Sequence, residues 1–291
     1  MKRSLGSKVF DVINVIIISL ISLVMLYPML HVAFASVSDS MMLKQHSGVL
    51  LKPIGFNLNA YKTVLMDQRV WTGYRNTAVV LVGGLSFSIV LTTIAAYCIS
   101  RKNLLFGKLM TGFITLTMFV NGGLIPTFLV VKSLGLLDSY WALILPGCIS
   151  AYNVIILRSG FMSVPESLVE ASTIDGANSV QTLVKVLIPL IMPTLAVIIL
   201  YYAVGIWNSW FQATIYIRET RLLPLQVVLR DILINSDTNN ESAENAARGA
   251  AAVSESIKYA TVMVTVIPIL VVYPSLQKYF TQGVMVGAVK G

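Results

Sequence analysis

Six long runs of apolar residues, none containing Asp, Glu, Lys or Arg, constrain this 291-residue chain more than any other feature of its sequence. Each run is long enough to cross a membrane as a helix, because about 20 helical residues span a hydrocarbon core roughly 30 Å thick. We therefore predict an all-α polytopic membrane protein, with six transmembrane helices in a single domain over residues 1–291. The predicted spans are 12–36, 76–99, 109–131, 139–157, 189–213 and 259–277.

The charged residues exclude several other classes of protein. Only 12% of the residues are charged, whereas a soluble domain carries about 25%, and a disordered chain would be poor in apolar residues. The net charge of +8 comes from Lys and Arg scattered between the apolar runs, whereas a nucleic-acid-binding protein clusters them on one face. We therefore expect membrane lipid, and no nucleic acid, around this chain.

The cations near the first two spans predict the orientation of the chain. Three precede the first span and three follow the second: Lys2, Arg3, Lys8, Arg101, Lys102 and Lys108. Because short cytoplasmic segments are enriched in Lys and Arg, we expect both termini in the cytoplasm. The loops 37–75 and 214–258 are then external, and the loop 158–188 and the tail 278–291 are cytoplasmic.

No span offers the side chains needed for ion coupling or for chemistry. Ion-coupled transporters and intramembrane hydrolases need carboxylates or histidines at membrane depth, and here only His31 lies within a span. Cys98 and Cys148 lie alone in apolar runs, so we predict no metal site and no catalytic residue. The sequence also lacks a Gly-rich phosphate loop ending in Gly-Lys-Ser/Thr. We expect no enzyme activity, and any transport must draw its energy from another subunit.

The segment 158–188, between the fourth and fifth spans, has the signals of two short helices joined by an elbow. Ser163 and Glu166 fit a capping box, which predicts a first helix over about 164–174. Gly176 can take the left-handed conformation that ends a helix. We therefore expect a helix that turns sharply at residue 176.

The second helix of this segment should begin at Asn178, because Gln181 stands three residues later, at the spacing of a capping box. Its apolar residues recur at helical spacing. The residues expected on this apolar face are Val180, Leu183, Val184 and Leu187. Pro189 then marks the entry into the fifth span.

Two interpretations of this loop fit the residues. It could be an amphipathic connector lying on the membrane surface. Alternatively, its small residues flanked by the carboxylates of Glu166, Glu170 and Asp175 would suit insertion into a basic groove of a soluble partner.

The loop resembles the EAA motif of ABC importer permeases. That motif reads Glu-Ala-Ala, three residues, Gly, nine residues, then Ile-x-Leu-Pro, and this sequence keeps every spacing with Glu170-Ala171-Ser172, Gly176 and Val186–Pro189. The three departures replace residues by others of similar size. Elsewhere, Trp207-Asn208 and the end of the chain from Lys278 to Gly291 are similar to carbohydrate permeases of the maltose MalG type.

The resemblance covers nearly the whole chain, and Pro224-Leu225-Gln226 resembles the subgroup that imports complex oligosaccharides and uronides. It implies the type I ABC importer permease fold in a bacterial plasma membrane. It also implies a second homologous permease, two ATPase subunits and an extracellular or periplasmic sugar-binding protein, which would meet loop 214–258. ATP and Mg²⁺ would bind the ATPase subunits, so no cofactor is expected in this chain, and the carbohydrate would cross by alternating access.

The resemblance places contacts with the ATPase subunits in two segments. Glu170 would pair with a basic residue there, small residues would permit close approach, and Gly176 would form the elbow. The expected contacts in the loop are Glu166, Glu170, Ala171, Ser172, Asp175, Gly176 and Pro189. The expected contacts in the tail are Gln282, Gly283, Gly287 and Lys290.

A stripe along the fifth span is a candidate wall of the substrate path. Tyr201, Gly205, Asn208 and Gln212 recur at helical spacing, and their ring and amides suit a sugar. Asn121, in the Asn-Gly-Gly break of the third span, is a further candidate, because such breaks persist in lipid only beside protein or a water-filled path. The alternative for the stripe is packing against the partner permease.

Three other functions remain open from the sequence. The first is a permease of the same architecture for amino acids, peptides or ions. The second is a membrane-embedded enzyme acting through Glu166, Glu170 and Asp175. The third is a scaffold without transport.

Overall fold

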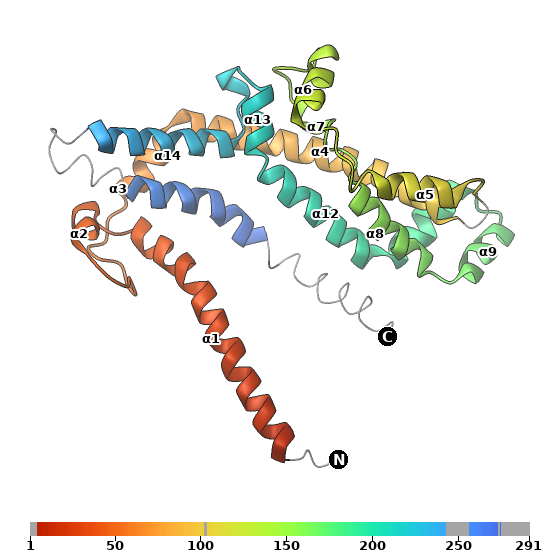
Figure 1. Cartoon of the computed structure of the whole chain (residues 1–291), viewed down its shortest axis with the longest axis horizontal. Coiled ribbons are helices and arrows are strands. Elements are labelled where there is room, and N and C mark those ends of the chain that lie inside the picture. Colours follow the sequence, from red (N-terminus) through yellow and green to blue (C-terminus); the bar gives the residue numbers. More distant parts are fainter. Residues whose placement is uncertain (1–4, 102–103, 243–255, 273, 275–291) are drawn as a thin grey trace. The chain divides into compact units, whose positions relative to one another are not determined.

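The computed structural model describes residues 5–101, 104–242, 256–272 and 274. Figure 1 shows their helices coloured along the chain. The described residues form helices and loops, with a single isolated β-bridge between Ser38 and Phe56. The chain divides into two compact units, which we describe separately: unit 1 comprises residues 1–70 and 229–268, and unit 2 comprises residues 71–228 and 269–291.

Unit 1 contains α1 (Leu5–Ser36), α2 (Ser40–Gln45), α3 (Asn59–Met66), most of α14 (Leu225–Ser242) and most of the helix Ser256–Val272. Its core gathers Ala35, Leu43 and Leu50 at the end of α1, with Tyr259 packed against them. The preceding turns of α1 are apolar and exposed within this chain, as expected of a surface covered by lipid or by another subunit.

Unit 2 is built on α4 (Gln68–Ser100), α8 (Ala151–Met162) and α12 (Met192–Trp207), which Figure 1 labels. Buried side chains of these helices and of residues 183–191 form one core. α8 packs closely on α12 at Gly160, where an added Cβ would lie only 3.1 Å from the Thr194 side chain. The other elements of unit 2 are α5 (Gly107–Leu116), α6 (Leu124–Ser133), α7 (Trp141–Ile144), α9 (Glu166–Ile174), α10 (Ser179–Gln181), the π-helix η1 (Thr182–Leu187), α11 (Ile188–Leu190), α13 (Trp210–Tyr216) and the 3₁₀-helix η2 (Thr220–Leu222).

Several of the predicted spans are broken rather than continuous. The run 109–131 is a pair of helices bent by 111°, because Gly123 takes a φ of +90° and its N–H binds the Asn121 side chain at 2.9 Å. The run 139–157 is divided between α7 and α8 around Pro146-Gly147, and the chain bends by 87° where α11 meets α12.

Two described helices, Lys8–Ser36 and Gln68–Ser100, are long and apolar enough to cross a membrane unbroken, and four spans result if each bent pair counts as one. The apolar helix Ser256–Val272, in the region of the sixth predicted span, is shorter. Proline and Asn-Gly-Gly account for the breaks, because each removes a helical hydrogen bond or favours a non-helical backbone.

Gly73 lets α4 approach the start of α14 closely. A Cβ at this position would lie 2.9 Å from the Cα of Leu225 and 3.2 Å from its N. We expect Gly73→Ala to destabilise the fold by about 1–3 kcal/mol, because the clash is with backbone that cannot move aside. The thermal unfolding midpoint of the purified protein in detergent should fall.

The matched control for this variant is Gly112→Ala in α5, where a Cβ meets nothing within 4 Å. That substitution should leave the midpoint unchanged or raise it, because alanine favours helix by about 1 kcal/mol over glycine. Equal midpoints for the two variants would contradict the close packing of α4 on Leu225.

Candidate functional site

The loop between α8 and α12 contains the predicted first helix, but its capping box was wrong. α9 begins at Glu166 and ends at Ile174. Ser163 instead caps the end of α8, and its hydroxyl donates to the Gly160 carbonyl at 2.7 Å. The reason is Pro165, because a proline disfavours helical backbone at the residue before it. The first helix therefore cannot start at residue 164.

The elbow and the second cap are confirmed. Gly176 takes a φ of +81°. The Asn178 side chain accepts from the Gln181 N–H at 2.9 Å, and the Gln181 side chain accepts from the Asn178 N–H at 3.0 Å. The hydroxyls of Ser172 and Thr182 bond at 3.0 Å in a buried position, which fastens the two helices across the elbow.

The apolar face of the second helix was predicted only in part. Leu183 and Leu187 are buried, but Val180 and Val184 are 68% and 54% exposed. Val180 lies in α10, before the π-helix of residues 182–187 that contains Val184, and the i→i+5 hydrogen bonds of a π-helix widen the turn. The side chains that face the core are therefore spaced differently from those of an α-helix.

The structure places the predicted coupling residues of the loop mostly on its exposed surface. The exposed ones are Glu166, Glu170, Ala171, Asp175, Gly176 and Pro189. Ser172 is the exception, at 7% exposure, and its position inside the elbow leaves Ala171 as the accessible residue of the Ala171-Ser172 pair.

A groove of about 1250 Å³ runs between α9 and the end of α4. Glu166 and Glu170 line it together with Tyr97 and Arg101. The Arg101 guanidinium lies 4.6 Å from the centre of the Tyr97 ring, a cation–π geometry. Sequence reasoning missed this arrangement, although the cations after the second span were the available signal.

A second cavity of about 840 Å³ lies among α4, α7, α8, α12 and α13. Three residues predicted for the substrate path line it, namely Asn121, Tyr201 and Gln212, and so does Gly205. Asn208 is not among its lining residues. The stripe assumed a helix running through residue 213, but α12 ends at Trp207 and α13 starts at Trp210, which changes the direction of the side chains.

The cavity wall combines hydroxyl, amide and aromatic groups. The rings of Tyr152 and Tyr201 lie 6.3 Å apart, and Asn153 adds an amide. The Tyr202 hydroxyl bonds Thr92 at 2.7 Å and accepts from the Ser150 N–H at 2.9 Å, which joins α4, α8 and α12. None of the residues that line this cavity is charged. Sequence reasoning missed Tyr152, which lies on another helix.

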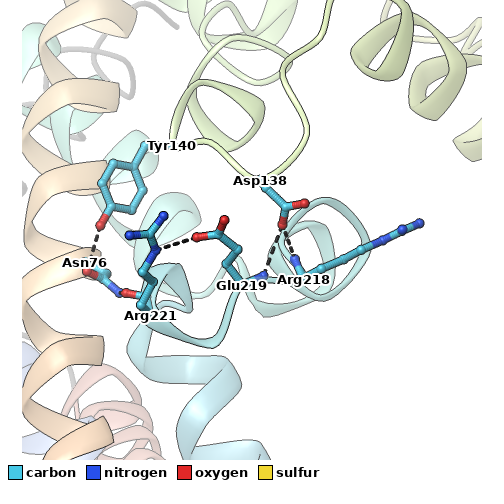
Figure 2. Close-up of polar contacts among 6 residues, drawn as sticks. All are labelled: Asn76, Asp138, Tyr140, Arg218, Glu219 and Arg221. Atoms are coloured by element: carbon cyan, nitrogen blue, oxygen red, sulfur yellow. Dashed lines mark hydrogen bonds and ion pairs between the residues drawn. The ribbon is translucent and has the colours of Figure 1, made fainter.

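Near the start of α4, polar side chains join three segments of unit 2 (Figure 2). Asn76, 1% exposed, donates to the carbonyls of Arg221 at 2.8 Å and Leu223 at 3.0 Å, and accepts from the Tyr140 hydroxyl at 2.8 Å. Asp138 accepts from the N–H groups of Arg218 and, at 3.1 Å, Glu219. These backbone hydrogen bonds, that of Arg218 first, lower the pKa of Asp138 below its ordinary 3.8.

The decisive comparison is with families of known proteins. The sequence model of the family described as "Binding-protein-dependent transport system inner membrane component" matches residues 88–286. The chain belongs to this family. The match includes residues 158–188, which we call the elbow loop, and most of the cavity wall, so both candidate sites lie largely in the part that this permease family shares.

Individual relatives extend over the whole chain. A polygalacturonan/rhamnogalacturonan transport system permease, YtcP, of Bacillus subtilis is 38% identical over 98% of this chain and 99% of its own. Protein LplC of the same organism is 36% identical over 100% of this chain and 98% of its own. A crystal structure of a bacterial ABC transporter that imports the acidic polysaccharide alginate contains a chain with a TM-score of 0.84 and 32% identity, covering 96% of this chain and 99% of that chain.

These findings confirm the all-α polytopic fold of a type I ABC importer permease and make the chain a component of a membrane transport system. The predicted tail contacts lie outside the described residues, namely Gln282, Gly283, Gly287 and Lys290. Within the described part of the chain, no group of three His, Cys, Asp or Glu side chains could hold a metal ion.

Proposed function

We propose that this chain forms half of the translocation path of an ABC importer for an oligosaccharide that contains uronic acid. The observation that carries the proposal is the uncharged, tyrosine- and amide-lined cavity in unit 2. A relative named as a polygalacturonan/rhamnogalacturonan permease and a structural relative from a transporter involved in alginate import support the substrate class.

The chemistry of the cavity suits such a substrate. The tyrosine pair offers ring faces to a sugar, and Asn121, Asn153 and Gln212 offer N–H donors and carbonyl acceptors to hydroxyls and carboxylates. No carboxylate lines the cavity, so a uronate would meet no like charge in the wall. Repulsion between like charges would be costly in a poorly solvated site.

The elbow loop supplies the second part of the proposed mechanism. Two ATPase subunits bind beneath this chain and a second homologous permease, and their closure on ATP moves α9 through contacts at Glu170 and Ala171. The movement turns the cavity outward to receive sugar from the binding protein, and hydrolysis returns it inward. ATP and Mg²⁺ stay on the ATPase subunits, and the chain itself acts without a cofactor or catalysis.

The arrangement along α4 is consistent with cytoplasmic termini. The groove at Arg101 and the hydrogen bonds at Asn76 are 25 residues apart in sequence, about 38 Å along a helix rising 1.5 Å per residue. The loop 158–188, expected inside, therefore lies near one end of α4, and Arg221 and Leu223, expected outside, lie near the other. We propose that the Asn76 end is external.

The test is reconstituted transport. Tagged chain is purified from its native membrane, its co-purifying partners are identified by mass spectrometry, and the complex is placed in liposomes with its binding protein. ATP-dependent uptake of oligogalacturonide, exceeding that of a neutral oligosaccharide of equal length, is expected. Uptake of amino acids or peptides instead would overturn the substrate class.

Tyr201→Ala tests the cavity within that complex. Loss of an aromatic contact worth about 0.5–1.5 kcal/mol should lower substrate-stimulated ATPase activity about two- to tenfold. Asn208→Ala, a polar truncation beside the same helix but outside the cavity lining, serves as the control and should leave it near wild type. Equal activities for wild type and Tyr201→Ala would remove Tyr201 from the path.

A further inference from the structure

The segment that follows α1 turns back along that helix instead of continuing away from it (Figure 1). Its two ends are fastened together by backbone hydrogen bonds. The Asp39 N–H donates to the Ile54 carbonyl at 2.9 Å. The Asn57 N–H donates to the Val37 carbonyl, also at 2.9 Å. We call residues 40–56, which these bonds enclose, the folded-back loop.

The tip of the folded-back loop lies beside the last turns of α1. The Leu50 N–H donates to the Tyr27 hydroxyl at 3.2 Å, and the same hydroxyl lies 3.3 Å from Nδ1 of His31. Tyr27 and His31 precede Ser36, where α1 ends, by nine and five residues. The tip therefore lies about 8–14 Å before the end of α1, since a helix rises 1.5 Å per residue.

This level of α1 coincides with the boundary of the hydrocarbon core of a membrane. The apolar run of α1 begins at Val12, directly after Asp11, and about 20 helical residues cross the core. Counted from Val12, the helix leaves the core near His31. Tyrosines such as Tyr27 are enriched at this boundary, because the ring is apolar and the hydroxyl is polar. The tip of the loop therefore lies where headgroups meet acyl chains.

The tip presents apolar side chains on both sides of a buried residue. Leu50 is 2% exposed and belongs to the core formed with Ala35 and Leu43. Its neighbours Val49 and Leu51 are 63% and 74% exposed. Because Leu50 is fixed by its packing and by its N–H, these neighbours are held outward. Contact with water would be unfavourable for both, and contact with lipid would relieve that cost.

Two lysines flank the apolar tip. Lys44 lies in the last turn of α2 and Lys52 directly follows Leu51. Both are exposed, and neither makes an ion pair with a described residue. Their apolar stems allow the ammonium groups to reach headgroup phosphates while the backbone stays at the boundary. Lysine is depleted in protein–protein interfaces, so this combination favours a lipid surface over another subunit.

We propose that the folded-back loop is an interfacial membrane anchor. Val49 and Leu51 insert among the acyl chains, and Lys44 and Lys52 bind the phosphates of anionic headgroups. Apolar area buried in lipid and attraction to anionic headgroups together determine the strength of such an anchor. The leaflet is the one at the carboxyl end of α1. The anchor does not depend on which substrate the complex transports.

The experiment measures the depth of the loop with a fluorescent probe on a single cysteine of the chain. The complex carrying Cys98→Ser, Cys148→Ser and Leu51→Cys is labelled with nitrobenzoxadiazole and placed in vesicles of phosphatidylglycerol and phosphatidylethanolamine. Complex with the serine replacements alone gives the background to be subtracted. Quenching is measured with aqueous iodide and with lipids that carry a nitroxide near the ester end of an acyl chain.

The matched control is Met66→Cys in the same background. Met66 is also apolar and is 71% exposed, but it precedes α4, whose residues 68–75 lie outside the predicted span 76–99. We expect the nitroxide lipid to quench the Leu51 probe about twofold or more above the Met66 probe, and iodide to do the reverse, as for a side chain at the acyl boundary.

Two results would overturn the anchor. Equal quenching of the Leu51 and Met66 probes by iodide would place the folded-back loop in water. Protection of the Leu51 probe from both quenchers would mean that another subunit covers it. Neither result bears on the substrate, so the proposed function stands or falls separately.

A charge reversal tests the two lysines. Lys44→Glu combined with Lys52→Glu should lower nitroxide quenching of the Leu51 probe about twofold in anionic vesicles, because the attraction to headgroups becomes a repulsion. The effect should be smaller in vesicles of phosphatidylcholine. Lys62→Glu, at an exposed position of α3, is the control and should leave quenching unchanged. Equal quenching with and without the reversal would refute headgroup binding by Lys44 and Lys52.

Discussion

Glu170→Lys is expected to abolish ATP-dependent uptake while the chain still inserts into the membrane. Glu170 is exposed on α9 and lines the groove beside Arg101. In the contact proposed for Glu170, the change would replace an attraction to a basic ATPase residue by a repulsion, and breaking a buried interfacial charge pair costs about 2–5 kcal/mol. Uptake in liposomes measures the loss of transport. Co-purification of the ATPase subunits measures the loss of their contact with the chain.

Two further variants separate charge from position in α9. Glu170→Gln removes the charge at nearly constant size and should retain part of the uptake. Ser167→Lys adds a cation to the same helix at an exposed position outside the groove and should have a smaller effect than Glu170→Lys. Uptake by Glu170→Lys near the wild-type level would refute the assignment of α9 to coupling.

Gly205→Trp is expected to block uptake from within the cavity. Gly205 lies in α12 and lines the cavity, and a Cβ there meets nothing within 4 Å. A Cβ can therefore be added there without a clash, and an indole attached to it would occupy part of the space proposed for the sugar. Uptake should fall to the level of liposomes lacking the complex, and ATP hydrolysis should persist.

The control for this variant is Gly112→Trp, a helical glycine with the same open surroundings that lies outside the cavity lining. It should leave uptake intact. If Gly205→Trp prevents the second permease from co-purifying, Gly205 is a packing position between the subunits and the path lies elsewhere.

The elbow loop was predictable because its signals are local. Gly176, Asn178 and Gln181 each determine backbone geometry within three residues, and the structure has the elbow and the cap where the sequence predicts them. The start of α9 was wrong by two residues, because the capping box at Ser163 was weighed without the effect of Pro165 on the residue before it.

The cavity was only partly predictable because it depends on contacts between distant segments. A helical stripe gave Tyr201 and Gln212, but Tyr152 faces Tyr201 from α8, 49 positions earlier in the sequence. Nor could the sequence reveal that Asn76 binds carbonyls 145 and 147 positions away. Such bonds follow from tertiary packing, and no periodicity along the chain encodes them.

The uncharged wall of the cavity has a consequence for how transport responds to acidity. Its lining residues include no carboxylate, imidazole, thiol or amine. Between about pH 5 and pH 8, the range in which an ordinary imidazole changes its charge, this wall keeps the same charge. Any acid or alkaline limit on uptake within that range must therefore originate in the substrate, in the partner subunits or in the parts of this chain outside the cavity.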